Sequence, residues 1–367
     1  MLKNLTAALT ARWFSTPLRG VRTCGLPFAN YDERNQTVKR RSFLTASFGA
    51  MMASAIGVPA FGQPISAGSP SEDKAAGRRY DRERRFAETT FGRIAHIDRG
   101  AGPAALFLHG FPLSSFQWRG AIDRLSPYRR CLAPDLMGLG YTQVAPGQSV
   151  APAAQADMIA ALLDRLEIQQ VDLIANDTGG AVAQLFVTKY AQRARTLLLT
   201  NCDVETDSPP PAVLPIIEAA RAGLYPDLWL EPWLRHKDVA RSPMGLGGMC
   251  YSNPAHPTDA ALDQYLGLLV ASPERKALVN RCALGFTPNP LDGIASHLRQ
   301  CVVPTRIVWG LGDTIFSPRN PDYLAGILPR VTGIRRIDKA KLFFPEEYPN
   351  IIAEEARLLW DRGGRFG

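Results

Sequence analysis

The chain has 367 residues, of which 46% are hydrophobic and 21% are charged. These proportions are ordinary for globular proteins and exclude the collagen, coiled-coil and wholly disordered classes. No run of 18 or more apolar residues occurs, which excludes a polytopic membrane protein and predicts no stable membrane insertion.

The formal net charge of +8 is concentrated near the start of the chain. The first 62 residues hold eight Lys or Arg and two acidic residues, whereas the other 305 residues hold 34 basic and 32 acidic ones. The basic excess therefore belongs to a leader rather than to a binding face, and nucleic acid is not expected as a partner.

The leader has the pattern of a bacterial export signal. Arg40 and Arg41 form a twin arginine that is followed by a short apolar run and then by small residues, which predicts cleavage before Gln63. We expect residues 1–62 to engage the export machinery and to direct the protein to the periplasm by the twin-arginine route. Residues 63–87 are predicted to form a flexible N-terminal segment.

From residue 90 onward, short apolar runs alternate with amphipathic helical stretches. The expected strands are the runs 104–108, 130–134, 171–176, 197–201, 303–310 and 333–338. Residues 151–166 show a helical pattern between two of these runs. This alternation predicts an α/β fold with a mostly parallel sheet that is flanked by helices.

One interval breaks the alternation. Residues 205–299 contain Pro clusters and several helical stretches but no clear strand run. A helical cap inserted between two core segments, 88–204 and 300–367, explains this pattern. The cap would lie over the carboxyl edge of the sheet, where open α/β folds keep their sites.

Asp177 lies in a tight turn between a predicted strand and a predicted helix. Small residues flank it at Ala175 and Gly179, which is the pattern of a nucleophile elbow with a carboxylate in place of Ser or Cys. The helix N-terminus is expected to keep Asp177 ionised, and such a carboxylate suits attack on an sp³ carbon with an ester intermediate. The alternative is an Asp that caps an ordinary helix.

A second motif supports the catalytic interpretation. His109-Gly110-Phe111-Pro112 follows an earlier predicted strand and is typical of an oxyanion-hole loop. Its donors would be the backbone N–H groups of Phe111 and Thr178. His109 is then expected to be structural rather than the catalytic base.

These motifs, with the stretches 114–119, 130–140 and 176–180, resemble α/β-hydrolases of the haloalkane dehalogenase and epoxide hydrolase group. The resemblance covers roughly residues 88–360. It implies an α/β-hydrolase fold with a helical cap, Asp177 as the nucleophile and Asp313 as the acid partner in the loop after a late strand.

The chain departs from that group at one position. Leu342 stands where the resemblance places the catalytic His, and no His follows His297. An Asp nucleophile attacks without a base, but a base is needed to activate water against the resulting ester. Either Glu346, Glu347 or a cap His supplies the base, or the protein does not hydrolyse by this route.

The electrophile is also open at this stage. Dehalogenases of this group often place a Trp after the nucleophile to hold the halide, and this chain has Thr178 there. Cap Trp residues could hold a halide instead, and two cap Tyr residues protonate the epoxide in epoxide hydrolases. The candidate substrate-pocket residues are Trp118, Trp229, Trp233, Tyr225, Tyr251 and Tyr265.

Together the residues and the resemblance predict a hydrolase of the haloalkane dehalogenase type acting on a small apolar molecule. An epoxide hydrolase and a non-catalytic or turnover-deficient binding protein are the alternatives. A serine esterase is disfavoured because the elbow offers no hydroxyl nucleophile. The sequence shows no phosphate-binding Gly loop and no metal-ligand spacing, so we expect neither a cofactor nor a metal.

Overall fold

The computed structural model describes residues 70–363. The predicted export leader, residues 1–62, lies outside them. Among the described residues, no helix combines the length and the apolar character that crossing a membrane requires.

A nine-stranded sheet organises the described part of the chain, in the order β1-β2-β4-β3-β6-β7-β8-β9 with β5 paired to β2. The strands are β1 (Arg85–Thr89), β2 (Gly92–Arg99), β3 (Ala104–Leu108), β4 (Arg130–Pro134), β5 (Gln143–Val144), β6 (Val171–Ala175), β7 (Ala194–Thr200), β8 (Thr305–Gly310) and β9 (Val331–Ile337). Strands β1, β2 and β5 pair antiparallel, and all pairs from β4 to β9 are parallel. The predicted α/β fold with a mostly parallel sheet is confirmed.

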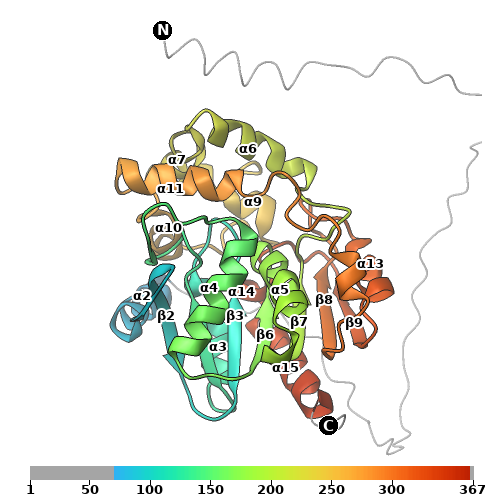
Figure 1. Cartoon of the computed structure of the whole chain (residues 1–367). Helices are drawn as coiled ribbons and strands as arrows, with labels where there is room; N and C mark the ends of the chain where they lie inside the picture. The colour runs from blue at the N-terminus through green and yellow to red at the C-terminus, as the bar shows by residue number, and fades with distance from the viewer. Residues whose placement is uncertain (1–69, 364–367) are drawn as a thin grey trace, which may run out of the picture. The chain divides into compact units, whose positions relative to one another are not determined.

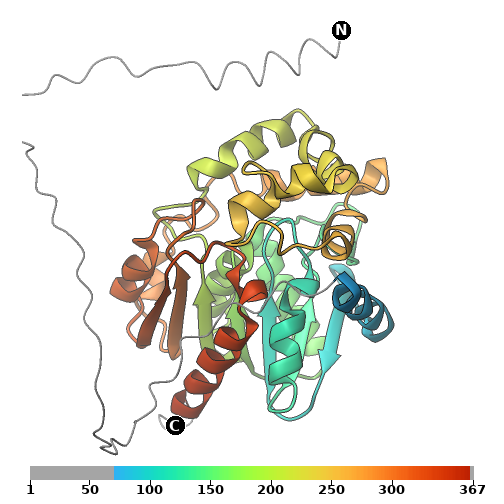
Figure 2. The ribbon, with the colours of Figure 1, turned by 180° about the vertical axis from the view of Figure 1, so that it is seen from behind.

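Helices cover both faces of this sheet. They are α3 (Arg119–Leu125), α4 (Pro152–Arg165), α5 (Thr178–Lys189), α13 (Asn320–Ile327) and α15 (Pro349–Gly363). Figure 1 shows α4 and α5 in front of the sheet, and Figure 2 shows α15 and α3 over the opposite face. This double cover explains why β3 and β6 are buried at every position. Strand β3 is a continuous apolar run, whereas the buried Asp172 interrupts the apolar run of β6 and pairs with Arg129 and Arg195.

The chain between β7 and β8 is helical. Its helices are η3 (Pro211–Val213), α6 (Leu214–Arg221), η4 (Pro226–Leu230), α7 (Glu231–Arg235), α8 (Lys237–Arg241), α9 (Leu246–Cys250), α10 (Asp259–Leu266), α11 (Pro273–Leu284) and α12 (Ala295–Leu298). Figure 1 shows α6, α7, α9 and α11 together beyond one edge of the sheet. We call residues 205–299 the helical segment.

The carboxyl ends of the central strands meet below the helical segment. Leu108 at the end of β3 pairs with Ala175 at the end of β6, and Ala175 also pairs with Leu199 in β7. The loops that follow these three strands are therefore neighbours, and they carry the residues that the sequence analysis singled out.

The prediction of a flexible segment over residues 63–87 is wrong where the structure describes it. Residues 70–83 form helix α2 (Pro70–Glu83), and the sheet already begins with β1. Helix α2 is held because Tyr80 is buried and packs edge-on against Phe116, with ring centroids 5.2 Å apart. Charged residues make this helix polar overall, so the sequence alone does not indicate that a few of its side chains are buried.

Candidate active site

Asp177 occupies a sharp turn between β6 and α5. Its φ of 54° and ψ of −130° are strained for a residue with a side chain, as expected for a nucleophile elbow. The Asp177 N–H donates to the carbonyl of Asn201 at 2.7 Å, which fixes the turn. At Gly179 a Cβ would lie 2.4 Å from the carbonyl oxygen of Leu108, so the crossing requires glycine.

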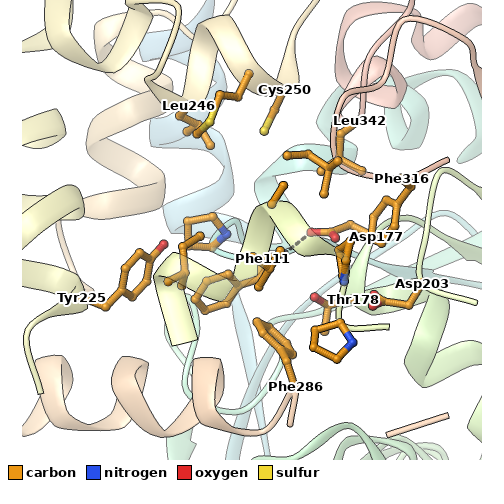
Figure 3. A pocket seen from close by; sticks show the side chains of 18 of the residues that line it. Phe111, Asp177, Thr178, Asp203, Tyr225, Leu246, Cys250, Phe286, Phe316 and Leu342 are labelled. Carbon is orange, nitrogen blue, oxygen red and sulfur yellow. Dashed lines mark hydrogen bonds between the residues drawn. The ribbon is translucent and has the colours of Figure 1, made fainter. Parts of the chain in front are cut away.

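The oxyanion-hole loop reaches the Asp177 carboxyl group directly. The Phe111 N–H donates to Oδ2 of Asp177 at 2.8 Å (Figure 3). The N–H of the adjacent Thr178 favours the ionised form of the same carboxyl group. A Cβ on Gly110 would lie 2.6 Å from Oδ2, so glycine permits this approach. The structure thus brings together the predicted nucleophile and both predicted donors.

His109 is structural, as predicted. Its Nε2 accepts a hydrogen bond from the Leu136 N–H at 2.9 Å, and its Nδ1 lies 2.9 Å from the carbonyl of Gly110. This pattern assigns the proton to Nδ1, and burial lowers the pKa of His109. A neutral ring with both nitrogens engaged is not a catalytic base.

A buried amide network joins three loops of the site. The Gly110 N–H donates to Oε1 of Gln117 at 3.0 Å, and Nε2 of Gln117 donates to Oδ1 of Asn176 at 2.7 Å. Nδ2 of Asn176 donates in turn to the carbonyl of Leu342 at 3.0 Å. The network holds the elbow, the oxyanion-hole loop and the loop that carries Leu342 in one arrangement.

A cavity of about 70 Å³ opens in front of Asp177. Most of its wall is apolar, including Leu246, Phe286, Phe316 and Leu342. Figure 3 shows Leu342 and Phe316 close to Asp177, on the side away from Phe286. The cavity therefore suits a small, mostly apolar molecule.

Two of the six aromatic pocket candidates line this cavity. Tyr225 lies across the cavity from Asp177 (Figure 3). Trp233 forms part of the cavity wall. Burial, together with the nearby Cys250 and Asp177, raises the pKa of Tyr225, so its phenol stays protonated.

The other four aromatic candidates lie outside the cavity, and their assignment to the substrate pocket is wrong. Trp118 is fully buried against Phe107, and Trp229 packs behind Tyr225 with ring centroids 5.6 Å apart. The other two belong to a buried ion network. The hydroxyl of Tyr251 donates to Glu346 at 2.6 Å, and that of Tyr265 lies 3.3 Å from the guanidinium of Arg119.

Asp313 lies in the loop after β8, behind the cavity wall. Nδ2 of Asn201 donates to its Oδ2 at 2.6 Å, and the Ile315 N–H donates to its Oδ1 at 2.8 Å. Burial raises the pKa of Asp313 to about 6 against these hydrogen bonds. Asp313 is close enough that its charge also raises the pKa of Asp177.

The residues proposed to replace the missing His do not reach the cavity. Oε1 of Glu346 forms an ion pair with Arg119 at 2.5 Å, and Glu347 accepts the N–H groups of Ser252 and Asn253, each at 2.9 Å. Neither carboxylate is available as a base, so both assignments are wrong.

The His residues of the helical segment are also wrong as bases. His256 is buried and stacks on Tyr251 with ring centroids 5.5 Å apart, and His236 and His297 are exposed. None of the three lines the cavity.

Asp203 is a cavity residue that the sequence analysis missed. It follows β7 and lines the cavity, and Figure 3 shows it beside Thr178 on the same side as Asp177. The hydroxyl of Ser208 donates to its Oδ1 at 2.9 Å, and burial raises the pKa of Asp203 to about 7. The feature that could have revealed Asp203 is its position just after β7, a strand that ends beside β6 at the edge of the sheet where α/β folds keep their sites.

The surroundings of Asp177 disfavour the ionised form of its carboxyl group. Burial is the main cause that raises its pKa well above the usual value, followed by the negative charge of Asp203 and then that of Asp313. The N–H groups of Phe111 and Thr178 lower the pKa but do not offset these effects. The net direction of the pKa shift is thus opposite to the predicted effect of the helix N-terminus, and no Lys, Arg or His of the described chain lines the cavity to favour the ionised form.

The described residues contain no group of three or more His, Cys, Asp or Glu side chains arranged to hold a metal ion.

Comparison with known proteins places this geometry in a family. The family described as alpha/beta hydrolase fold matches residues 103–348. Haloalkane dehalogenase 2 of Mycobacterium tuberculosis is 26% identical over 286 residues, covering 75% of this chain and 93% of that protein. Epoxide hydrolase 2 of Siraitia grosvenorii is 40% identical over 102 residues, covering 27% of this chain and 32% of that protein.

Solved structures share the fold. A thermophilic esterase from Thermogutta terrifontis superposes with a TM-score of 0.61 at 24% identity, covering 76% of this chain and 98% of that one. A haloalkane dehalogenase from Bradyrhizobium elkani also gives 0.61, at 22% identity, covering 76% of this chain and 97% of that one. These likenesses concern the fold alone.

Proposed function

The chain belongs to the α/β-hydrolase family, and we propose that it is a hydrolase in which Asp177 attacks an sp³ carbon and forms an alkyl ester. One observation carries this proposal. The Asp177 carboxyl group lies in a strained elbow at a cavity wall, with its Oδ2 on the Phe111 N–H at 2.8 Å. This arrangement leaves Oδ1 as the attacking atom and Oδ2 as the oxygen whose charge the oxyanion hole can hold.

The substrate class that we propose is a small alkyl halide. The cavity wall is mostly apolar, and a relative that covers 75% of this chain is a haloalkane dehalogenase. In the first step Oδ1 of Asp177 forms a bond to the halogen-bearing carbon, and the carbon–halogen bond breaks with its electron pair leaving on the halide. The phenol of Tyr225 and the indole of Trp233 are the wall groups that can donate to that halide.

An epoxide is the second candidate, and Tyr225 is the observation that favours it. Its protonated hydroxyl lies across the cavity from Asp177, where it could donate a proton to the epoxide oxygen as the ring opens (Figure 3). An epoxide hydrolase is also among the relatives, although it matches only part of the chain.

The mass of the intact full-length protein tests this proposal. We expect a gain equal to the alkyl group after incubation with primary alkyl bromides, or equal to the whole epoxide after incubation with terminal epoxides. The alcohol or diol should form alongside the adduct. Both signals should vanish in Asp177→Asn and persist in the control variant Glu205→Gln. Glu205 does not line the cavity, and its carboxylate accepts a hydrogen bond from the Tyr323 hydroxyl at 2.8 Å.

A wild-type protein that forms neither adduct nor product with any member of the panel would overturn the proposal. Binding of these molecules without reaction would then favour the non-catalytic alternative. An adduct that survives in Asp177→Asn would assign the reaction to another nucleophile.

A further inference from the structure

The ester on Asp177 must be hydrolysed before a second turnover, and this step lacks its expected base. Leu342 lines the cavity beside Asp177 but has no atom that can accept a proton from water. Glu346 and Glu347 are held in ion pairs and backbone hydrogen bonds away from the cavity. The base has to come from the cavity wall itself.

The wall offers few groups that could accept a proton. Besides Asp177, its titratable residues in the described chain are Asp203, Tyr225 and Cys250. Burial raises the pKa of both Tyr225 and Cys250, so their neutral, protonated forms prevail at neutral pH and accept no proton. Asp203 is the remaining carboxyl group.

We propose that Asp203 is the general base that activates water for hydrolysis of the Asp177 ester. This inference rests on the proposed function. Its geometric basis is that β6 and β7 are adjacent parallel strands, so the loops after Ala175 and Leu199 place both carboxyl groups at one cavity. The Ser208 hydroxyl orients Asp203 at 2.9 Å.

The charge coupling between the two carboxyl groups supports this role. Among the neighbouring charges, that of Asp203 raises the pKa of Asp177 most, ahead of that of Asp313. Alkylation converts Asp177 into a neutral ester, so an ionised Asp203 beside it meets no second carboxylate. The pKa of Asp203, about 7 with burial as its main cause, is also in the range where a general base works near neutral pH.

The proposed step balances without any other reactant. The Asp203 carboxylate takes a proton from water as the water oxygen bonds to Cγ of the Asp177 ester. The charge on the former carbonyl oxygen is held by the N–H groups of Phe111 and Thr178. The bond from Cγ to the alkyl oxygen then breaks, and that oxygen recovers the proton from Asp203 and leaves as the alcohol. Asp177 remains as a carboxylic acid, whose proton passes to solvent.

Replacement of the carboxylate by an amide separates the two steps. In Asp203→Asn we expect the adduct on Asp177 to form and to persist, with alcohol release slowed about 100-fold or more, since a general base contributes at least that factor. Intact mass reports the adduct, and product release reports its hydrolysis. Glu205→Gln, in the same loop region but outside the cavity, should turn over as the wild type does.

A rescue experiment distinguishes a base from a residue that only shapes the loop. Formate should accelerate hydrolysis of the adduct in Asp203→Ala, because a small carboxylate can occupy the vacated space, and it should not do so in the wild type. In the Asp203→Asn background, Leu342→His should also restore turnover, because it places an imidazole on the wall of the same cavity.

The outcomes separate this inference from the function on which it rests. Wild-type turnover in Asp203→Asn would overturn the role of Asp203 and leave Asp177 as the nucleophile. A wild-type adduct that never hydrolyses would do the same and would identify a turnover-deficient protein. Absence of both adduct and product in the wild type would overturn both proposals together.

Discussion

Leu342 changes the charge of this site more than its shape. An imidazole at this position would place a group that can become cationic on the cavity wall beside Asp177. With Leu342 the cavity region instead combines Asp177, Asp203 and Asp313 with no basic side chain of the described chain on the cavity wall. Burial raises the pKa of all three carboxyl groups, and their mutual repulsion raises that of Asp177 further.

This charge balance predicts how alkylation depends on pH. Only ionised Asp177 is nucleophilic, and its pKa is raised by burial first and by Asp203 next. The rate of adduct formation should therefore still increase with pH in the range where an ordinary Asp side chain, with a pKa of about 3.9, is already fully ionised. Asp203→Asn removes a negative charge, so the increase should occur at lower pH in that variant. Adduct formation measured by intact mass in a pH series checks this, and a rate that falls with rising pH would contradict it.

The residues of the site differ in how visible they are in the sequence. Asp177 and Phe111 could be found because each lies in a short motif that directly follows a strand. Asp203 was missed because no motif surrounds it, and its role depends on the pairing of β7 with β6, which only the folded sheet provides. Glu346 was misassigned because the sequence does not reveal that it pairs with Arg119.

At the scale of elements, the crossing of α5 over the end of β3 positions Asp177 and the Phe111 N–H. Gly179 lies against the carbonyl oxygens of Leu108 and His109, and an added Cβ would lie 2.4 Å and 2.7 Å from them. These are backbone atoms of the strand and loop that deliver the Phe111 N–H, so they cannot move without displacing that donor.

Gly179→Ala should therefore damage both stability and reactivity. We expect the free energy of unfolding to fall by about 1–3 kcal/mol, as for overpacking in a dense core, and adduct formation on Asp177 to slow because the Phe111 N–H is displaced. Urea denaturation and intact mass measure the two effects. The matched control is Gly326→Ala in α13, where an added Cβ meets nothing within 4 Å. Equal behaviour of the two variants would refute the argument.

The strands were predicted correctly where both faces of the strand are buried. The runs 104–108 and 130–134 coincide with β3 and β4, because strands covered on both faces read as unbroken apolar runs. Strands β1 and β2 were not predicted, since they pair antiparallel at one side of the sheet and carry charged residues at exposed positions. Helix α2 was taken for a flexible segment because it buries only a few of its side chains.

At the scale of the whole molecule, a buried ion network joins parts of the chain that are far apart in sequence. Arg119 at the start of α3 pairs with Asp73 of α2 at 3.0 Å and with Glu346 of α14 (Phe344–Glu347) at 2.5 Å. The helical segment contributes two donors, because the Thr258 hydroxyl donates to Asp73 and the Tyr251 hydroxyl donates to Glu346, each at 2.6 Å. The network thus fixes the helical segment and the loop of Leu342 to the core.

Removal of the central cation should destabilise the protein as a whole. Arg119→Met leaves Asp73 and Glu346 buried without their partner, which costs about 3–5 kcal/mol for a buried pair broken on one side. The control Arg221→Met breaks an exposed pair with Glu218, whose side chains are 54% and 66% exposed, and should cost about 0–1 kcal/mol. Urea denaturation of both variants measures the difference. Similar losses would mean that the network contributes no more than a surface pair, and that packing of apolar side chains alone holds the helical segment to the core.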